Sequence, residues 1–270
     1  TAYKNIDQLK QLANAFTDDC KDFIHLDKKS KFSREAVEQL RSVANVRLVL
    51  RQFSVNWAGL NHLKAILMLS REALKDSEIE YFHVISGQDF PIKTCFEMSA
   101  FLSLNSGKEY IEYFSLPTEK WANGGLDRIN LYNFFDVFNA KTFFGRLAIK
   151  ISIFLQKLLK VNRNIQRYAP RLFGGSTWWT LSRPCLTYVI DFTDRSPLFL
   201  KRFKCSCCEE EIYYQTVIMN SPFKDNVVNT NLRYINWTPR VGNPPAVLDE
   251  TDFDELINSH HLFARTFDYV

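Results

Sequence analysis

Hydrophobic positions along this chain alternate between two periods. Apolar residues recur every three or four positions, which predicts amphipathic helices over segments 5–16, 33–44 and 57–74. Short runs of β-branched and aromatic residues follow these helices and predict strands over 22–27, 46–50 and 81–85. Repeated helix–strand units are typical of an α/β domain with a mostly parallel central sheet and helices on both faces.

A polar turn interrupts the pattern after the third predicted strand. Gly87, Asp89 and Pro91 fall within SGQDFPIK, which predicts a loop before a new amphipathic helix over 97–104. Open α/β sheets bind ligands at the carboxyl ends of their strands, so this loop is a candidate site. The simpler role for Asp89 is to accept hydrogen bonds from backbone N–H groups of the turn.

Composition indicates one ordinary globular domain. The 270 residues are 46% hydrophobic and 24% charged, and no linker, low-complexity tract or repeat divides them. The net charge of +4 is too small to indicate nucleic-acid binding. No apolar run reaches about 18 residues and no secretory signal opens the chain, so we expect a soluble protein of the cytoplasm.

The cysteines do not indicate a metal site. Cys205, Cys207 and Cys208 form a CSCC cluster without the second cysteine or histidine pair of a structural zinc site. Reduced thiols in a cytosolic protein are the simpler interpretation.

Five sequence blocks occur in an order that resembles one known family. They are SGQDFPIK (86–93), FGGSTWWTLSR (173–183), EIYYQT (211–216), RYINW (233–237) and HLFARTFD (261–268). In this order they resemble the core-2/I-branching glycosyltransferases, which include β-1,6-N-acetylglucosaminyltransferases and peptide O-xylosyltransferases. The resemblance spans most of the chain. It implies an α/β fold of the GT-A nucleotide-sugar transferase type, and we expect a bacterial member of the family.

The resemblance also implies an organisation for the single domain 1–270. Residues 1–110 would form the nucleotide-sugar half, and residues 111–270 the acceptor and catalytic half. A strand normally precedes the first helix in the family, whereas this chain begins with TAYKN. We therefore expect that the numbered sequence lacks that strand.

Glu211 is the candidate catalytic base. It heads EIYYQT, which resembles the family segment whose glutamate takes the proton of the acceptor hydroxyl during in-line displacement. Its neighbours Glu209 and Glu210 would disfavour ionisation and so raise the pKa of Glu211. The alternative is a solvated acid at a helix N-terminus, where carboxylates are favoured in any case.

Basic side chains are the candidates for binding the diphosphate of the donor. The one Asp-x-Asp triplet, Asp252 to Asp254, lies at an acidic helix start near the C-terminus, where helix capping explains it better than metal binding. The family it resembles is metal-independent, which implies Arg265 and secondarily Arg240 for the phosphates. This chain has Thr266 where the family usually has a lysine. Both arginines could instead be surface residues.

The remaining candidate site residues, except for Ser176, are also implied by the resemblance. For the donor the resemblance implies Asp27, at the end of a predicted strand, and for the acceptor it implies Glu112, Lys120 and Trp237. Ser176 follows two glycines that permit close approach of a ligand, and it could bond the donor, as we expect first, or the acceptor. The alternatives are a turn-forming Asp27, surface ion pairs, and a tryptophan in the core. Of the adjacent Trp178 and Trp179, the alternating pattern favours one inside and one outside.

The segment 146–167 has a basic amphipathic pattern that owes nothing to the family. Its cations recur at helical spacing and are Arg146, Lys150, Lys157, Lys160, Arg163 and Arg167. The opposite face is rich in leucine, isoleucine and phenylalanine, a combination typical of helices that lie on an anionic membrane surface. The alternative is a packed helix with a solvated basic face. On the membrane interpretation the protein is peripheral on the inner membrane face and the acceptor could be a lipid-linked glycan.

Together these patterns predict an inverting glycosyltransferase that needs no metal. It would move a sugar, N-acetylglucosamine first, from a UDP donor to a glycan hydroxyl. One alternative is the same chemistry with UDP-xylose or UDP-glucuronic acid. Another is a carbohydrate-binding relic without turnover, at which Thr266 and the missing strand hint; such a relic would not need Glu211.

Overall fold

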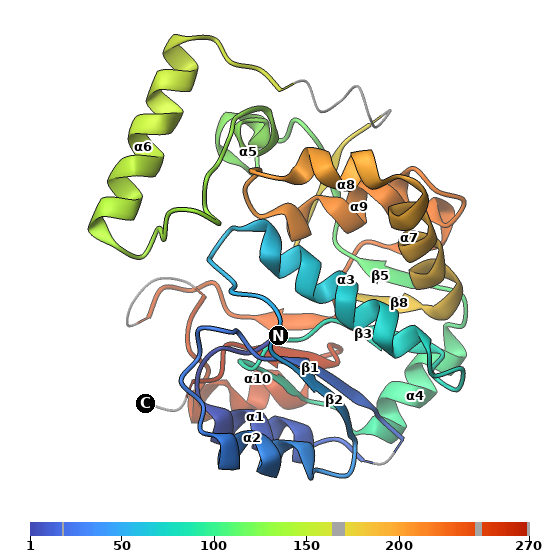
Figure 1. The fold of residues 1–270 in the computed structure, drawn as a ribbon. Coiled ribbons are helices and arrows are strands. Elements are labelled where there is room, and N and C mark those ends of the chain that lie inside the picture. Colours follow the sequence, from blue (N-terminus) through green and yellow to red (C-terminus); the bar gives the residue numbers. More distant parts are fainter. Residues whose placement is uncertain (18, 164–170, 241–244, 269–270) are drawn as a thin grey trace.

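A computed structural model describes residues 1–270 apart from 18, 164–170, 241–244 and 269–270 (Figure 1). The helices are α1 Ile6–Asn14, α2 Arg34–Arg41, α3 Leu60–Leu74, α4 Cys95–Leu104, α5 Asp127–Asn130, α6 Phe143–Leu158, α7 Arg183–Arg195, α8 Pro197–Phe203, α9 Tyr213–Met219 and α10 Phe253–Ile257. The strands are β1 Asp22–His25, β2 Val46–Leu50, β3 Tyr81–His83, β4 Asp89–Pro91, β5 Glu109–Ile111, β6 Phe114–Ser115, β7 Phe173–Gly174, β8 Trp179–Ser182, β9 Val227–Val228, β10 Arg233–Ile235 and β11 Phe263–Arg265. The α/β class is confirmed.

The first helix–strand units form as the periodicity predicts. β1 pairs in parallel with β2, and α1 and α2 cover this pair with their apolar stripes. Leu12 on α1 and Leu40 on α2 are buried against Ile24 on β1. The Ser33 side chain accepts a hydrogen bond from the Ala36 N–H and so defines the start of α2.

The sheets are mixed, so the expectation of a mostly parallel sheet is wrong in that respect. β8 runs antiparallel to both β3 and β5, while β9 runs parallel to β5. The predicted loop SGQDFPIK contains β4, which pairs antiparallel with β11, and β11 pairs in parallel with β10. Hydrophobic periodicity carries no information on strand direction, and β4 is too short to produce a pattern of its own.

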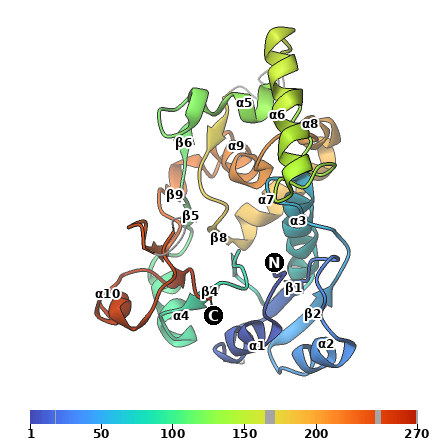
Figure 2. The ribbon, with the colours of Figure 1, turned by 90° about the vertical axis from the view of Figure 1, so that its left-hand side faces the viewer.

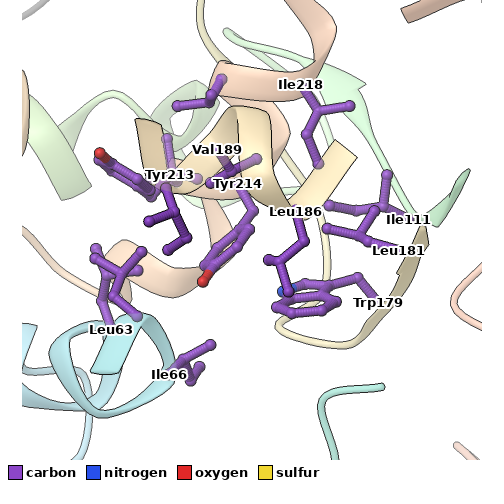
Figure 3. Close-up of a cluster of buried hydrophobic side chains, with 14 of the residues drawn as sticks. Leu63, Ile66, Ile111, Trp179, Leu181, Leu186, Val189, Tyr213, Tyr214 and Ile218 are labelled. Atoms are coloured by element: carbon purple, nitrogen blue, oxygen red, sulfur yellow. The ribbon is translucent and has the colours of Figure 1, made fainter. Parts of the chain in front are cut away.

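The main core lies between α3, α7 and α9 and the sheet that contains β8 and β5 (Figure 3). Trp179, Tyr213 and Tyr214 fill it, and Trp179 is 1% exposed. Both tyrosine hydroxyls have partners, Thr193 for Tyr213 and Ser70 for Tyr214, as buried hydroxyls require. The prediction that at least one of the paired tryptophans packs in the core is confirmed.

Residues 1 and 2 join the carboxyl ends of β1 and β3. The Ala2 N–H donates to the His25 carbonyl, and the Thr1 amino group donates to the Ile85 carbonyl. A cavity of ≈ 560 Å³ extends between β1 and β3, and none of the predicted site residues lines it. The strand expected before residue 1 and the division at residue 110 both stay predictions.

The helix expected over 146–167 is shorter than predicted. α6 ends at Leu158, and Lys160 adopts a positive φ of 52° that turns the chain away. Arg163 is buried and donates to the carbonyls of Leu131, Cys205 and Lys204, so it does not belong to a solvated basic face. Those carbonyls lie far away in sequence and could not be foreseen. Arg167 lies outside the described residues.

α6 lies at the opposite end of the molecule from α1 and α2 in both views (Figures 1 and 2). None of the helices in the described part of the chain combines the length and the apolar character needed to span a bilayer.

Candidate active site

The acidic run 209–211 forms a 3₁₀ turn directly before α9. Cys208 adopts a positive φ of 52° at its start, and the buried Tyr213 and Tyr214 anchor the helix that follows. Glu209 and Glu210 point into the protein, whereas the Glu211 side chain is 28% exposed. Glu211 is therefore the acid of this run that a substrate can reach.

Each of the three acids has a different environment. Glu211 accepts a hydrogen bond from Arg128, with 2.6 Å between its Oε2 and the arginine Nη1. Glu210 Oε1 lies 2.9 Å from His62 Nδ1. Both carboxylate oxygens of Glu209 are buried without a hydrogen-bond partner among the described residues.

The ionisation of Glu211 suits a proton acceptor at neutral pH. Burial and the nearby Glu210 carboxylate raise the pKa of Glu211 to about 7, against the opposing effect of the Arg128 guanidinium. A general base works best when its pKa lies near the working pH. The pKa of Glu209 is raised to about 9, mainly by burial, so Glu209 is neutral at pH 7.

Arg128 is held on its other side by an aromatic ring. Its guanidinium carbon lies 3.7 Å from the ring centroid of Trp121, a cation–π contact. Trp121 itself packs edge-on against Phe114, at 5.0 Å between ring centroids. The arginine is thereby fixed between an aromatic wall and the candidate base.

The glycine pair 174–175 brings the ends of β5 and β7 together beside Glu211. The Gly175 N–H donates to the Glu211 carbonyl at 2.9 Å. A Cβ on Gly175 would lie 1.8 Å from the carbonyl oxygen of Glu112, so only glycine allows this approach. Ser176 follows at once, its carbonyl bound by Gln215 and its Oγ by Asn231. Glu112, Ser176 and Glu211 therefore belong to one local group.

The other two predicted acceptor residues lie at the surface. Lys120 is exposed, with its Nζ 4.8 Å from the ring centroid of Phe114, and so borders the Trp121 wall. Trp237 follows β10 and is 64% exposed. An exposed tryptophan is a suitable platform for a sugar ring, and Trp237 is not the core residue that the alternative required.

Arg265 lies beside Trp178, which belongs to the same chain segment as Gly175. Its guanidinium carbon is 4.5 Å from the ring centroid of Trp178, and its Nε is 3.7 Å from Asp89 Oδ1. The buried Arg233 contacts the same tryptophan ring and the same carboxylate. Asp89 also accepts from the Ser86 N–H, which confirms its role in the turn. Two arginines thus share one aspartate, and Arg265 keeps some exposure, at 18%.

Asp27 performs the turn role that was its alternative. Its Oδ1 accepts from the backbone N–H groups of Lys29, at 2.9 Å, and Val55, at 3.2 Å. The carboxylate thus ties the loop after β1 to the loop after β2. Binding of a nucleotide by Asp27 stays a prediction.

Arg240 forms an ion pair with the acidic triplet. Its guanidinium contacts both carboxylate oxygens of Asp252, at 2.7 and 2.8 Å. Asp252 also completes a capping box with Asp249, which confirms the capping interpretation of the triplet. This pair occupies Arg240, and its donor role stays a prediction.

The described residues contain no preformed metal cluster. Within residues 1–17, 19–163, 171–240 and 245–268, no group of three or more His, Cys, Asp or Glu side chains is placed to hold a metal ion. The six cysteines are free thiols.

Sequence reasoning missed Arg128, Trp121 and His62. Arg128 meets Glu211 from 83 residues away along the chain, and no motif around LDRIN signals it. His62 lies within an amphipathic helix where a polar position predicts only exposure. The acidic run alone was a usable signal, because three adjacent acids need compensating partners.

This chain is similar to known proteins over most of its length. A family model described as "Branch: Core-2/I-Branching enzyme" matches residues 1–256. Xylosyltransferase 2 of Canis lupus familiaris is 29% identical over 243 residues, which cover 88% of this chain and 26% of that protein. Xylosyltransferase oxt of Drosophila pseudoobscura pseudoobscura is 27% identical over 226 residues, 82% of this chain and 23% of that protein. Xylosyltransferase 1 of Homo sapiens is 27% identical over 225 residues, 82% and 21% respectively.

The protein therefore has a mixed α/β architecture consistent with the GT-A-like fold of glycosyltransferases. It belongs to the core-2/I-branching enzyme family. The chain spans about a quarter of the length of the curated relatives it matches. These relatives are animal proteins, and a bacterial origin stays a prediction.

Proposed function

We propose that this protein is an inverting, metal-independent transferase that moves a sugar from a UDP donor to a hydroxyl of a glycan, with Glu211 as the general base. One observation carries the proposal. Glu211 is the partly exposed member of the acidic run, its pKa is raised to about 7, and its carbonyl accepts from the N–H of Gly175, the neighbour of Ser176. A glycan-binding relic would have no need of such an acid.

The reaction is a single displacement. The acceptor hydroxyl loses its proton to the Glu211 carboxylate while its oxygen bonds to the anomeric carbon of the donor. The bond from that carbon to the diphosphate breaks, and UDP leaves with the electron pair, so the configuration inverts. Arg265 would compensate the charge on the diphosphate, because a guanidinium binds phosphate oxygens in a bidentate manner. Glu112, Lys120 and Trp237 would hold the acceptor.

N-acetylglucosamine is the donor sugar we propose first, in keeping with the resemblance to branching enzymes. Xylose is the second candidate, because the similar curated proteins are named xylosyltransferases. We propose a glycan carried by a lipid at the cytoplasmic membrane face as the acceptor. The exposed apolar and basic surface of α6 supports a peripheral position there.

The direct test is Glu211→Gln. We expect a loss of roughly 10²–10⁴ in kcat, the usual contribution of a general base, with UDP affinity by calorimetry unchanged. Glu35→Gln, on the exposed face of α2, is the matched control. A panel of UDP-sugars offered to the wild type identifies the donor. A Glu211→Gln rate within threefold of the wild type would assign the base elsewhere, and absence of turnover with every donor would favour the relic.

A further inference from the structure

α6 presents a continuous apolar stripe to solvent. Six of its large side chains are between 45% and 81% exposed: Phe143, Phe144, Leu147, Ile151, Phe154 and Leu158. At about 100° per residue these positions fall within an arc of roughly 100°. The residues that α6 buries, Gly145, Ile149 and Gln156, fall on the opposite side. The stripe therefore faces away from the protein.

Contacts with the rest of the protein nevertheless hold α6 in place, so the stripe faces a fixed direction. Gln156 bonds both the N–H and the carbonyl of Tyr132, and Lys157 forms an ion pair with Asp127 at 2.6 Å. Ile149 packs into a small core with Phe135 and Cys208. Burial of the stripe against this protein would need these contacts to break. An exposed apolar patch of this extent marks an interaction surface.

Cations border the stripe along one edge. Arg146 and Lys150 are exposed, fall between the buried side and the stripe, and have no acidic partner in the described part of the chain. With Lys141 they surround a groove of ≈ 420 Å³ whose wall is formed by Trp57 and Phe135. Trp57 is 63% exposed. No aspartate or glutamate occurs in the sequence between Asp136 and Asp191. The surface is thus apolar and cationic at once.

We propose that this face of α6 binds the surface of an anionic phospholipid bilayer. The stripe enters the boundary between headgroups and acyl chains, and Lys141, Arg146 and Lys150 bind headgroup phosphates with Trp57 beside them at the interface. Charge complementarity favours this occupant over a second copy of the chain. In a symmetric antiparallel pair of α6 helices the cations that border the stripe would meet cations, without an acid to separate them.

This proposal rests on the proposed function in one respect: it specifies the membrane that was named there only in general terms. The test of vesicle binding does not depend on transfer activity. Vesicles of phosphatidylcholine with and without phosphatidylglycerol are sedimented with the full chain at rising salt. We expect binding to the anionic vesicles at low salt, little binding to neutral ones, and a decline once the Debye length shortens. Inorganic phosphate should compete no better than chloride at equal ionic strength.

Two double variants separate the contributions. Arg146→Glu with Lys150→Glu should weaken binding at least tenfold, and Phe144→Ser with Phe154→Ser should abolish retention at moderate salt. The matched controls make the same chemical changes elsewhere at exposed positions: Arg195→Glu with Lys224→Glu, and Phe96→Ser with Leu198→Ser. These should bind as the wild type does. Activity on a water-soluble acceptor, measured in parallel, reports on the proposed function independently.

Three results would overturn the proposal. The first is a wild type that ignores anionic vesicles at low ionic strength. The second is binding that survives both α6 double variants. The third is a dimer in sedimentation velocity that the phenylalanine variants dissociate and that vesicles do not displace, which would make the stripe an interface between two copies.

Discussion

Arg128 distinguishes Glu211 from the two acids beside it. It gives Glu211 a charged partner and lowers the pKa that burial and Glu210 raise. Its contact with the Trp121 ring keeps it in place. The balance between these effects sets the pH at which the base becomes available.

We predict that Arg128→Met moves the acidic limb of the kcat/KM profile to higher pH. Loss of the cation raises the pKa of Glu211, so the carboxylate form is depleted at a pH where the wild type still has it. Below that limb activity falls about tenfold per pH unit. Arg128→Lys retains the charge and should restore most of the profile. A lower rate with an unmoved limb would mean that Arg128 only supports the fold.

Glu209 should make the stability of the protein depend on pH. The pKa of this carboxyl is about 9 in the folded protein against 4.5 ordinarily, so between these values the unfolded chain binds fewer protons. Stability contributed by this group is fully present below pH 4.5 and is lost as pH rises toward 9. The slope is at most about 1.4 kcal/mol per pH unit.

Glu209→Gln removes this titration. Its melting temperature should gain on the wild type as pH rises from 5 to 9, because the amide stays neutral throughout. Glu35→Gln, at an exposed site, serves as the control. Melting curves that stay parallel over the whole range would show that Glu209 ionises normally.

We predict that Arg265, and not a metal ion, compensates the charge on the diphosphate. Turnover should survive EDTA, and Arg265→Ala should weaken UDP binding more than acceptor binding, because Arg265 is the partly exposed arginine beside Trp178. Calorimetry with UDP and a rate assay with EDTA check both halves. Activity that EDTA removes and Mn²⁺ restores would contradict this.

At the scale of elements, Gly175 is the point where close packing positions the site. An added Cβ would lie 1.8 Å from the Glu112 carbonyl, and a backbone atom cannot yield without moving β5 or the segment after β7. We predict that Gly175→Ala keeps its fold by circular dichroism and loses about 10² in kcat/KM, since displacements near 1 Å have that effect.

Gly107→Ala is the control for this loss. A Cβ there meets nothing within 4 Å, but the φ of +80° strains any other residue. It should therefore lower the melting temperature without lowering kcat/KM. Equal losses of activity in both variants would trace the effect of Gly175→Ala to general instability.

The sequence predicted elements better than their arrangement. Amphipathic periods located α1, α2 and α3, because one face of each packs on a core. Strand directions, β4 and the end of α6 depend on contacts distant in sequence. Arg163 illustrates this. Its spacing suits a helical face, but its guanidinium donates to the carbonyls of Leu131 and Cys205.

The sequence likewise predicted only part of the candidate site. Glu211 and Arg265 were predicted from short ordered motifs, and the structure places them at the two ends of the segment 175–178. Arg128 and His62 carry no local signal, since the acids that they contact lie far away in the sequence. Arg240 was predicted from its charge, and only the structure shows Asp252 beside it.

At the scale of the whole molecule, the candidate active site and the apolar stripe of α6 are separate surfaces. α5 connects them. The base lies beside α5, which carries Arg128, and the neighbouring Asp127 holds Lys157 of α6. The loop after β2 also reaches α6, because its Trp57 lines the groove beside Arg146 and Lys150. A partner that binds α6 therefore approaches the side of the protein that carries α5 and the loop after β2.

The contacts that hold α6 in place would fix the distance between Glu211 and a membrane. If the stripe lies in a bilayer, the ion pair to Asp127 and the bonds of Gln156 keep Glu211 at a constant height above the lipid. A hydroxyl on a glycan chain is then within reach only when the chain is long enough to rise to that height. The position of one helix would thus select acceptors by length, whatever sugars they contain.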